Sequence, residues 1–263
     1  MNYGLYVSAS GVMVNAHRQD VLANNLANVN TAGFKPQFTD LRQRPAASQE
    51  NGPVDFGLSN ALLDKLGGGV FGRDQRVSFA TGTPVKTGRD LDASLTTDNA
   101  FFAVQYTDVH TGQEDIRLTR AGKFTTNAQG ELVTQSGERV LNVNDEPIEV
   151  SEARPVIGRT GEIRMLDAQG NVVGRDQLQI VQADLNTLKP MGKNLFEMTA
   201  GDSRIAIDQP ALLPGHYESS GTNAIATMME IVSATRAATS NARMIQYHDQ
   251  MLNASVNTFA RLA

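Results

Sequence analysis

The sequence predicts an α+β fold, with an antiparallel β-sandwich or barrel-like central domain and N- and C-terminal helices that pair as a coiled coil. Charge separates the ends from the middle, because residues 1–34 and 219–263 carry seven charged side chains in 79 residues, whereas the other 184 residues carry 44. Both ends show helical spacing, and the middle alternates short β-prone runs with turn residues. Solvent-exposed helices usually carry many charges, so we expect these ends to be covered on more than one side.

The N-terminal element is expected within residues 1–40 and starts as a helix. Steps of four and three residues connect a stripe of mostly small side chains: Leu5, Ala9, Val12, Ala16, Gln19, Ala23 and Leu26. The helix should end within LANNLANVNTAGFKPQF, residues 22–38, because Gly33 tolerates a positive φ and Pro36 cannot continue a helix. Asparagine is a poor residue inside helices, yet this stretch holds Asn24, Asn25, Asn28 and Asn30.

An extended linker is expected at residues 41–80, with one short helix near residues 58–66. A β-rich outer domain should follow at residues 81–219, because short β-prone runs recur there without long helical patterns between them. Residues 127–130, Asn-Ala-Gln-Gly, and residues 167–170, Asp-Ala-Gln-Gly, are predicted to be turns between strands.

The C-terminal element is expected at residues 220–263 as one long helix. A 3.5-residue repeat persists for about five heptads, which is typical of a coiled coil. The repeat consists of Ala224, Met228, Ile231, Thr235, Ala238, Ala242, Ile245, Asp249, Leu252, Val256 and Phe259. Small residues bury little apolar area, so neither terminal helix is expected to fold alone. The simplest solution pairs the two ends of the chain. Ordinary packing of two helices in a globular core is the alternative.

Catalytic, metal and cofactor sites are not expected from the residue pattern. The formal net charge is −5 and there is no cysteine, so nothing indicates a nucleic-acid surface, a disulfide or a thiolate metal site. The four histidines, His17, His110, His216 and His248, lack metal-ligand spacing. Three nearby carboxylates, Asp90, Asp92 and Asp98, could pair as acid and base, but a turn between strands explains them more economically. No apolar run spans a membrane, and no cleavable signal peptide is expected.

Four motifs resemble the bacterial flagellar basal-body rod and hook family. ANNLANVNTAGFK at residues 23–35 is similar to the family's N-terminal signature, and TRAGKFTTNAQGELVTQSGERVL at residues 119–141 to its central one. LLPGHYESSGTN at residues 212–223 and RAATSNARMIQYHDQML at residues 236–252 are similar to the approach to the last helix and to that helix. Two places depart from the pattern: TTDNAFF replaces the family's Gly-Asp-Gly-Phe-Phe, and Ala238 stands where tyrosine is frequent.

The resemblance implies a structural, non-enzymatic axial subunit, closest to the proximal-rod or distal-rod protein. In this family the terminal helices pair as an inner coiled coil, and subunits stack helically into a tube that transmits torque and encloses the export channel. It implies partnership with copies of itself, with neighbouring rod and hook proteins and with the flagellar type III export apparatus, in a periplasm-spanning basal body. No cofactor, nucleic acid or membrane insertion is implied. Two alternatives stay open: a hook-type or hook-associated axial protein, and a carbohydrate-active β-domain enzyme.

The resemblance also places candidate assembly residues near both ends of the chain. We expect amide side chains at the first helix end to bond to neighbouring subunits, because amides offer both donors and acceptors. Capping of the helix within one subunit is the competing interpretation. The candidate assembly residues are Asn24, Asn25, Asn28, Asn30, Gly33, Phe34, Arg236, Asn241, Ala242, Ile245, Asp249, Leu252 and Phe259.

Overall fold

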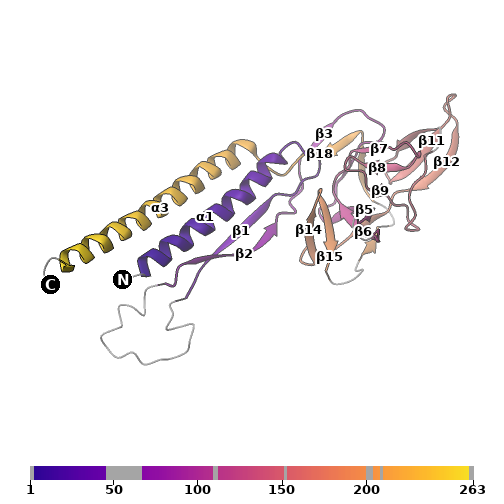
Figure 1. The fold of residues 1–263 in the computed structure, drawn as a ribbon. Helices are drawn as coiled ribbons and strands as arrows, with labels where there is room; N and C mark the ends of the chain where they lie inside the picture. Colours follow the sequence, from indigo (N-terminus) through magenta and orange to yellow (C-terminus); the bar gives the residue numbers. More distant parts are fainter. Residues whose placement is uncertain are drawn as a thin grey trace. The chain divides into compact units, whose positions relative to one another are not determined.

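Two long helices, α1 (Tyr3–Ala27) and α3 (Ala224–Ala260), lie side by side and run antiparallel (Figure 1). Gln19 Nε2 donates to Thr235 Oγ1 over 3.2 Å, and Gly4 lies against the imidazole of His248. Partner numbers therefore fall along α3 as they rise along α1. The predicted pairing of the chain's two ends is confirmed.

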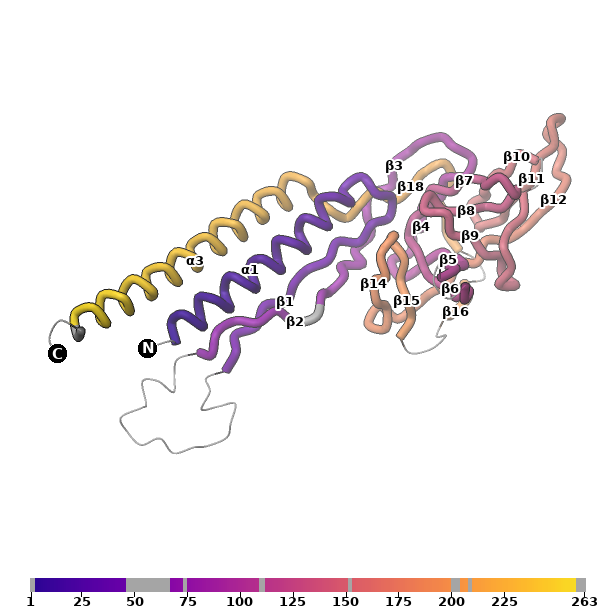
Figure 2. The backbone as a smooth tube through the Cα atoms, viewed as in Figure 1, coloured from indigo at the N-terminus to yellow at the C-terminus, as the bar shows by residue number. Residues whose placement is uncertain are grey.

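The chain divides into two compact units in this computed structural model. The helical unit comprises Met1–Ala27, Gln37–Arg76 and Asn223–Ala263, and the β unit comprises Asn28–Pro36 and Val77–Thr222. Figure 2 follows the backbone through both units. The structure describes residues 3–45, 67–108, 112–150, 153–199, 204–207 and 210–260.

The buried face of α1 differs from the predicted stripe, and this corrects the expectation. Its buried side chains are Ser8, Val14, Val21, Leu22 and Asn25. Of the predicted stripe, Ala16 and Ala23 are exposed, and the half-buried members are Leu5, Ala9, Val12, Gln19 and Leu26. α1 packs against both α3 and β1, so its covered surface is wider than one coiled-coil seam. With apolar and small residues all around the helix, spacing alone does not select the covered face.

The predicted α3 stripe is correct in part. Its half-buried members are Ala224, Ile231, Ala238, Ala242, Ile245 and Leu252, whereas Met228, Thr235, Asp249 and Val256 are exposed. Further covered positions are Thr227, Ala234, Asn241 and His248, each one residue before a stripe member. This seam accepts polar side chains because the opposite positions on α1 include Gly4 and Gly11, where bare Cα atoms leave room.

Part of the expected linker forms two paired strands. β1 (Gln37–Gln43) and β2 (Val70–Val77) make a two-stranded sheet in the region expected to be extended connection. The expected linker is therefore partly regular β-structure, because β1 extends to Gln43 and β2 begins at Val70. The expected short helix at residues 58–66 lies outside the described residues.

The β unit is built from short antiparallel strands, as predicted. Its largest sheet has the order β14-β15-β6-β5-β9-β8-β7, with β13 and β16 attached beside β5; β10-β11-β12 form a second sheet, and β17-β4 and β18-β3 form pairs. The strands are β3 (Pro84–Lys86), β4 (Ala93–Leu95), β5 (Ala100–Thr107), β6 (Glu114–Thr119), β7 (Phe124–Thr126), β8 (Leu132–Thr134), β9 (Arg139–Val140), β10 (Arg154–Ile157), β11 (Glu162–Leu166), β12 (Val172–Gln177), β13 (Ile180–Gln182), β14 (Leu188–Gly192), β15 (Leu195–Met198), β16 (Ile205–Ala206), β17 (Leu212–Pro214) and β18 (His216–Glu218).

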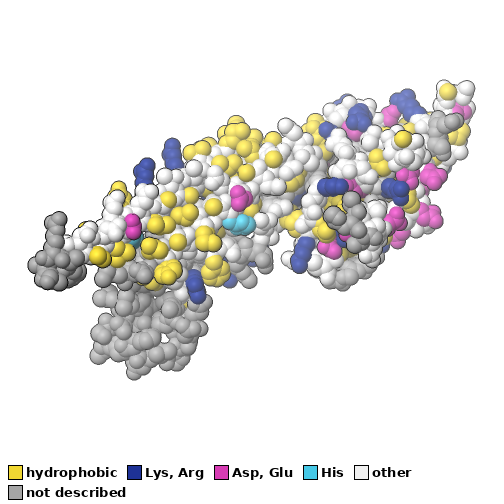
Figure 3. Space-filling view, in the orientation of Figure 1, with side chains coloured by type: hydrophobic (Ala, Val, Ile, Leu, Met, Phe, Trp, Pro, Cys, Tyr) yellow, Lys and Arg dark blue, Asp and Glu magenta, His cyan; other side chains and the backbone are white. Residues whose placement is uncertain are grey.

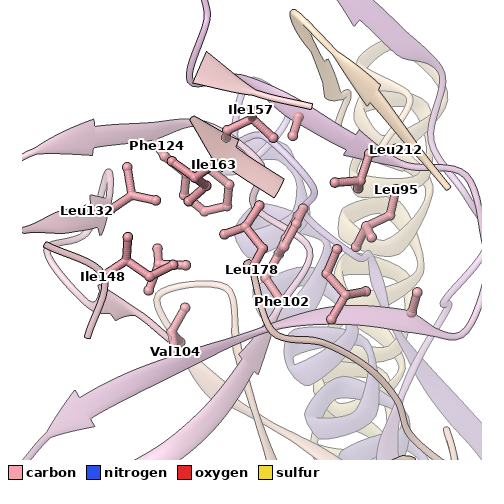
Figure 4. Packing of buried hydrophobic residues seen from close by; sticks show 14 of the residues in the cluster. Leu95, Phe102, Val104, Phe124, Leu132, Ile148, Ile157, Ile163, Leu178 and Leu212 are labelled. Atoms are coloured by element: carbon pink, nitrogen blue, oxygen red, sulfur yellow. The ribbon is translucent and has the colours of Figure 1, made fainter. Parts of the chain in front are cut away.

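Two clusters of buried apolar residues form the core of the β unit, and Figure 4 shows the larger one. Phe102 and Phe124 meet edge to face, with their ring centroids 5.1 Å apart, among aliphatic side chains that include Ile163 and Leu178. Branched and aromatic residues suit such a core because they pack well on pleated surfaces. The core gives the β unit an internal source of stability that does not depend on the helices.

Both predicted turns are present. The amide nitrogen of Gly130 donates to the carbonyl oxygen of Asn127 over 3.1 Å, and that of Gly170 donates to Asp167 over 3.0 Å. Both glycines have positive φ, at 81° and 86°. In each turn the leading Asn or Asp side chain accepts two backbone N–H groups, which is the reason these residue types favour turns.

Candidate assembly site

The helical unit exposes large apolar side chains along both helices (Figure 3). On α3 they fall into two groups, one within residues 225–232 and one within residues 244–256, with exposed fractions from 46% to 74%. They are Tyr3, Tyr6 and Met13 on α1, and Ile225, Met228, Met229, Val232, Met244, Tyr247, Met251 and Val256 on α3. We call this set the apolar helical face. Contiguous exposed apolar surface normally marks a place where another macromolecule binds.

The two helices that carry this apolar helical face have few charged side chains. α1 carries only Arg18 and Asp20, and α3 carries Glu230, Arg236, Arg243 and Asp249. The ion pair between Arg18 and Glu230, at 3.4 Å, lies between the helices and joins two of these six charges. The rest of the helical surface therefore has little charge with which to hold water.

The amide-rich end of α1 divides between two roles. Asn25 is buried, its Nδ2 donates to the carbonyl oxygen of Gln37 over 2.7 Å, and its Oδ1 accepts from the Gln37 amide over 2.9 Å. Both ends of the amide thus bind β1 of the same chain, which corrects the expectation that Asn25 bonds to a neighbouring subunit. Asn28 Oδ1 accepts from the Thr31 hydroxyl over 3.1 Å. Asn24 and Asn30 are exposed.

Gly33 and Phe34 lie inside the β unit and do not form an outer surface. Gly33 has φ of +66°, as predicted, and its N–H donates to the carbonyl oxygen of Glu218 over 2.7 Å. Phe34 is buried, and its carbonyl oxygen accepts from the Gly221 amide over 2.9 Å. The expectation that these two residues touch a neighbour is therefore corrected, because their own β unit covers them.

A buried ion cluster lies beside these two residues and was missed by sequence reasoning. Lys35 Nζ is 2.6 Å from Glu218 Oε1, and Arg120 Nε is 2.9 Å from Glu218 Oε2. At most 1% of each of the three side chains is exposed. Each residue belongs to a different motif that resembles the rod and hook family. Lys35 lies in the motif at residues 23–35, Arg120 in that at residues 119–141, and Glu218 in that at residues 212–223.

Backbone carbonyl groups also bind this ion cluster, although Arg120 Nη2 is buried without a hydrogen-bond partner. Arg120 Nη1 donates to the carbonyl oxygens of Thr97, Asp98 and Ala100, over 2.7, 2.9 and 2.7 Å. Lys35 Nζ also donates to the Ala80 carbonyl oxygen over 2.7 Å. Buried charges are tolerated only when such partners replace water. The TTDNAFF segment, which departs from the family pattern, thus supplies the oxygens that hold Arg120.

Burial lowers the pKa of Lys35 below its ordinary value, because the charged ammonium loses hydration. The carboxylate of Glu218 opposes this shift by its charge and by its hydrogen bond, and the nearby guanidinium of Arg120 adds to it. The bond distances place Lys35 as the donor of a charge-assisted pair to Glu218.

The remaining candidate residues are spread around α3. Asn241, Ala242, Ile245 and Leu252 are half-buried, and Asn241 lies against Gly11 of α1. Arg236 and Asp249 are exposed. The side chain of Phe259 lies outside the described part of the chain. The structure thus puts one group of candidates in the seam with α1 and leaves another on the surface.

The three candidate carboxylates make separate structural bonds. Asp90 Oδ2 accepts from Arg154 Nε over 2.7 Å, Asp92 Oδ2 accepts from the Thr87 hydroxyl over 2.6 Å, and Asp98 bonds to Thr81. Because each carboxylate binds a different partner, the three do not converge on one site. Among the described residues, which exclude His110, no group of three or more His, Asp or Glu side chains is arranged to hold a metal ion. No helix in the described part of the chain is long and apolar enough to cross a membrane.

A low-charge helix pair with an apolar helical face, joined to a β unit, defines a protein that assembles with others. Comparison with known proteins agrees. Family models described as Flagella basal body rod protein, Flagellar hook protein FlgE/F/G D1 domain and Flagellar basal body rod FlgEFG protein C-terminal match residues 5–35, 97–212 and 213–258.

Curated relatives match the chain over nearly its whole length. The flagellar basal-body rod protein FlgG of Bacillus subtilis (strain 168) is 31% identical, with 96% of this chain and 97% of that protein covered. FlgG of Caulobacter vibrioides is 30% identical over 95% of this chain and 97% of that protein, and its FlgF is 29% identical over 100% of both. The chain belongs to the flagellar basal-body rod protein family. This places it in the flagellum, and the three relatives named here are rod proteins.

Proposed function

We propose that this chain is a structural, non-enzymatic subunit of the flagellar basal-body rod, and that it polymerises helically through the apolar helical face. In this proposal the partners are further copies of the chain and neighbouring rod and hook proteins. The assembled tube transmits torque and encloses the export channel. Export by the flagellar type III apparatus, without a cleaved signal, belongs to the same proposal.

The apolar helical face is the observation that carries this proposal. Complete burial of one Val, Leu, Ile or Met side chain contributes about 1.5–3 kcal/mol. Two or three newly covered side chains per contact could thus offset part of the cost of association, which is about 4–15 kcal/mol. Because a subunit in a helical array repeats each contact, a face with few charges suits burial against copies of itself.

Val232→Glu tests this proposal. Val232 lies in the apolar helical face with 50% of its area exposed, so the subunit should fold normally. The buried carboxylate would oppose assembly, and we expect few or no complete basal bodies and loss of motility. Val173→Glu in β12 is the matched control, since Val173 is 63% exposed on the β unit. Normal basal bodies from Val232→Glu would contradict the proposal, as would equal loss in both variants.

Ala242→Leu tests the seam of the paired helices. Ala242 is half-buried, and enlarging a small residue in a packed seam costs about 1–3 kcal/mol, repeated in every subunit. We expect the β unit to fold and the protein to be exported, but rod completion to fail. A fully motile strain would show that the side chain at this position has room.

A further inference from the structure

Two short connectors lead from the β unit into the helices. The first connector, residues 28–36, follows α1, and the second, residues 216–222, precedes α3. They are joined by backbone bonds: Gly33 N–H donates to Glu218, and Gly221 N–H donates to Phe34. The ion pair between Lys35 and Glu218 adds a buried side-chain link between the same two connectors.

The third member of the ion cluster anchors both connectors to the β unit. Arg120 binds the second oxygen of Glu218 and three backbone carbonyl groups that precede and begin β5. Gly82 N–H donates to Glu218 Oε1 over 2.6 Å, which attaches the same carboxylate to a further segment of the β unit. Loss of Glu218 would leave both cations without an ionic partner in a dry site, whereas loss of one cation leaves Glu218 paired with the other.

This anchor shortens the chain that separates the two helices. Along the sequence, 196 residues lie between Ala27 and Ala224. Through the ion pair, only seven residues separate Ala27 from Lys35, and five separate Glu218 from Ala224. For a flexible chain, the probability that two ends meet falls as roughly the 3/2 power of loop length, so the shorter path raises it by at most about 65-fold.

We propose that Lys35, Arg120 and Glu218 are positioning residues. They hold the C-terminal end of α1 close to the N-terminal end of α3, so that each helix is present at a high effective concentration near the other. The helix pair is poor in large buried side chains and gains little from packing, so a high effective concentration decides whether it forms in the free subunit. The three motifs that resemble the family signatures then share one task, although they are far apart in the sequence. This inference goes beyond rod assembly and concerns the soluble subunit alone.

A disulfide between the helices measures this effect directly. Gln19→Cys and Thr235→Cys replace two side chains that meet across the helix pair, with Gln19 Nε2 3.2 Å from Thr235 Oγ1, and the natural chain has no cysteine. Equilibrium with reduced and oxidised glutathione reports the effective concentration of one thiol at the other. Adding Lys35→Met to this protein removes the ion-pair link between the two connectors, leaves their two backbone hydrogen bonds in place, and leaves Glu218 paired with Arg120.

We expect Lys35→Met to lower the effective concentration severalfold, and by less than the ceiling of about 65-fold, because the backbone bonds between the connectors remain. Ile163→Ala is the control, because Ile163 is fully buried in the core of the β unit and its truncation destabilises that unit without touching the connectors. An unchanged value in Lys35→Met would overturn the proposal, and so would an equal fall in both variants. If circular dichroism shows Lys35→Met to be unfolded, Lys35→Gln provides the same test while retaining a donor for Ala80. Rod assembly takes no part in this measurement, so its result does not depend on the proposed function.

Discussion

Gly33→Ala should destabilise the β unit through two separable effects. The backbone at Gly33 has φ of +66°, and placing an L-residue with a side chain in this left-handed region costs about 1–2 kcal/mol. A Cβ added there would also lie 2.3 Å from the carbonyl oxygen of Arg120 and 2.4 Å from its carbonyl carbon. These are backbone atoms, which cannot rotate away as a flexible side chain could.

The second effect resembles overpacking of a core, which typically costs about 1–3 kcal/mol. We therefore expect Gly33→Ala to lower the free energy of unfolding by about 2–5 kcal/mol, measured by urea denaturation of the soluble subunit and far-UV circular dichroism. Gly88→Ala separates the two effects, because Gly88 has φ of +72° and an added Cβ there would meet nothing within 4 Å. It should show the backbone cost alone. Equal losses in the two variants would refute the argument that Gly33 is required for close approach to Arg120.

Three further predictions follow from contacts elsewhere in the chain. Gly11→Ala should weaken the helix pair, because its Cβ would lie 2.5 Å from Asn241 Nδ2, and Asn241→Ala in the same chain should restore the pairing measured by cross-linking. The pKa of Asp167 is lowered chiefly by the hydrogen bond from the backbone N–H of Asn171, so its contribution to the turn is present above about pH 3.9 and is lost as pH falls through the lower folded-state pKa. An Asn171 amide resonance that does not titrate in this acid range would contradict this. In the free subunit, amide exchange should be fast in α1 and α3 but slow in the buried part of residues 28–36; equal protection of the helices and the β unit would refute weak helix pairing.

The amino-acid pattern by itself determined the fold class and the division between low-charge helical ends and a β-rich middle. It also located the two Asx-Ala-Gln-Gly turns and the positive φ of Gly33, because turn chemistry depends on a few adjacent residues. Periodicity located the long terminal helices, but it identified only part of the α3 seam. The stripe of small residues has no strongly apolar side to distinguish one face from another.

Only the tertiary structure decided what the motif residues do. Asn25 binds Gln37 of its own chain, and Lys35, Arg120 and Glu218 meet in one dry cluster. All three motifs are recognisable in the sequence, but their residue pattern does not show that these charges pair. A signal was present, since Lys35 and Glu218 are isolated charges that border the charge-poor ends of the chain. Their partnership depends on contacts between residues separated by 183 and 98 positions, and such contacts form only when a β unit brings distant segments together.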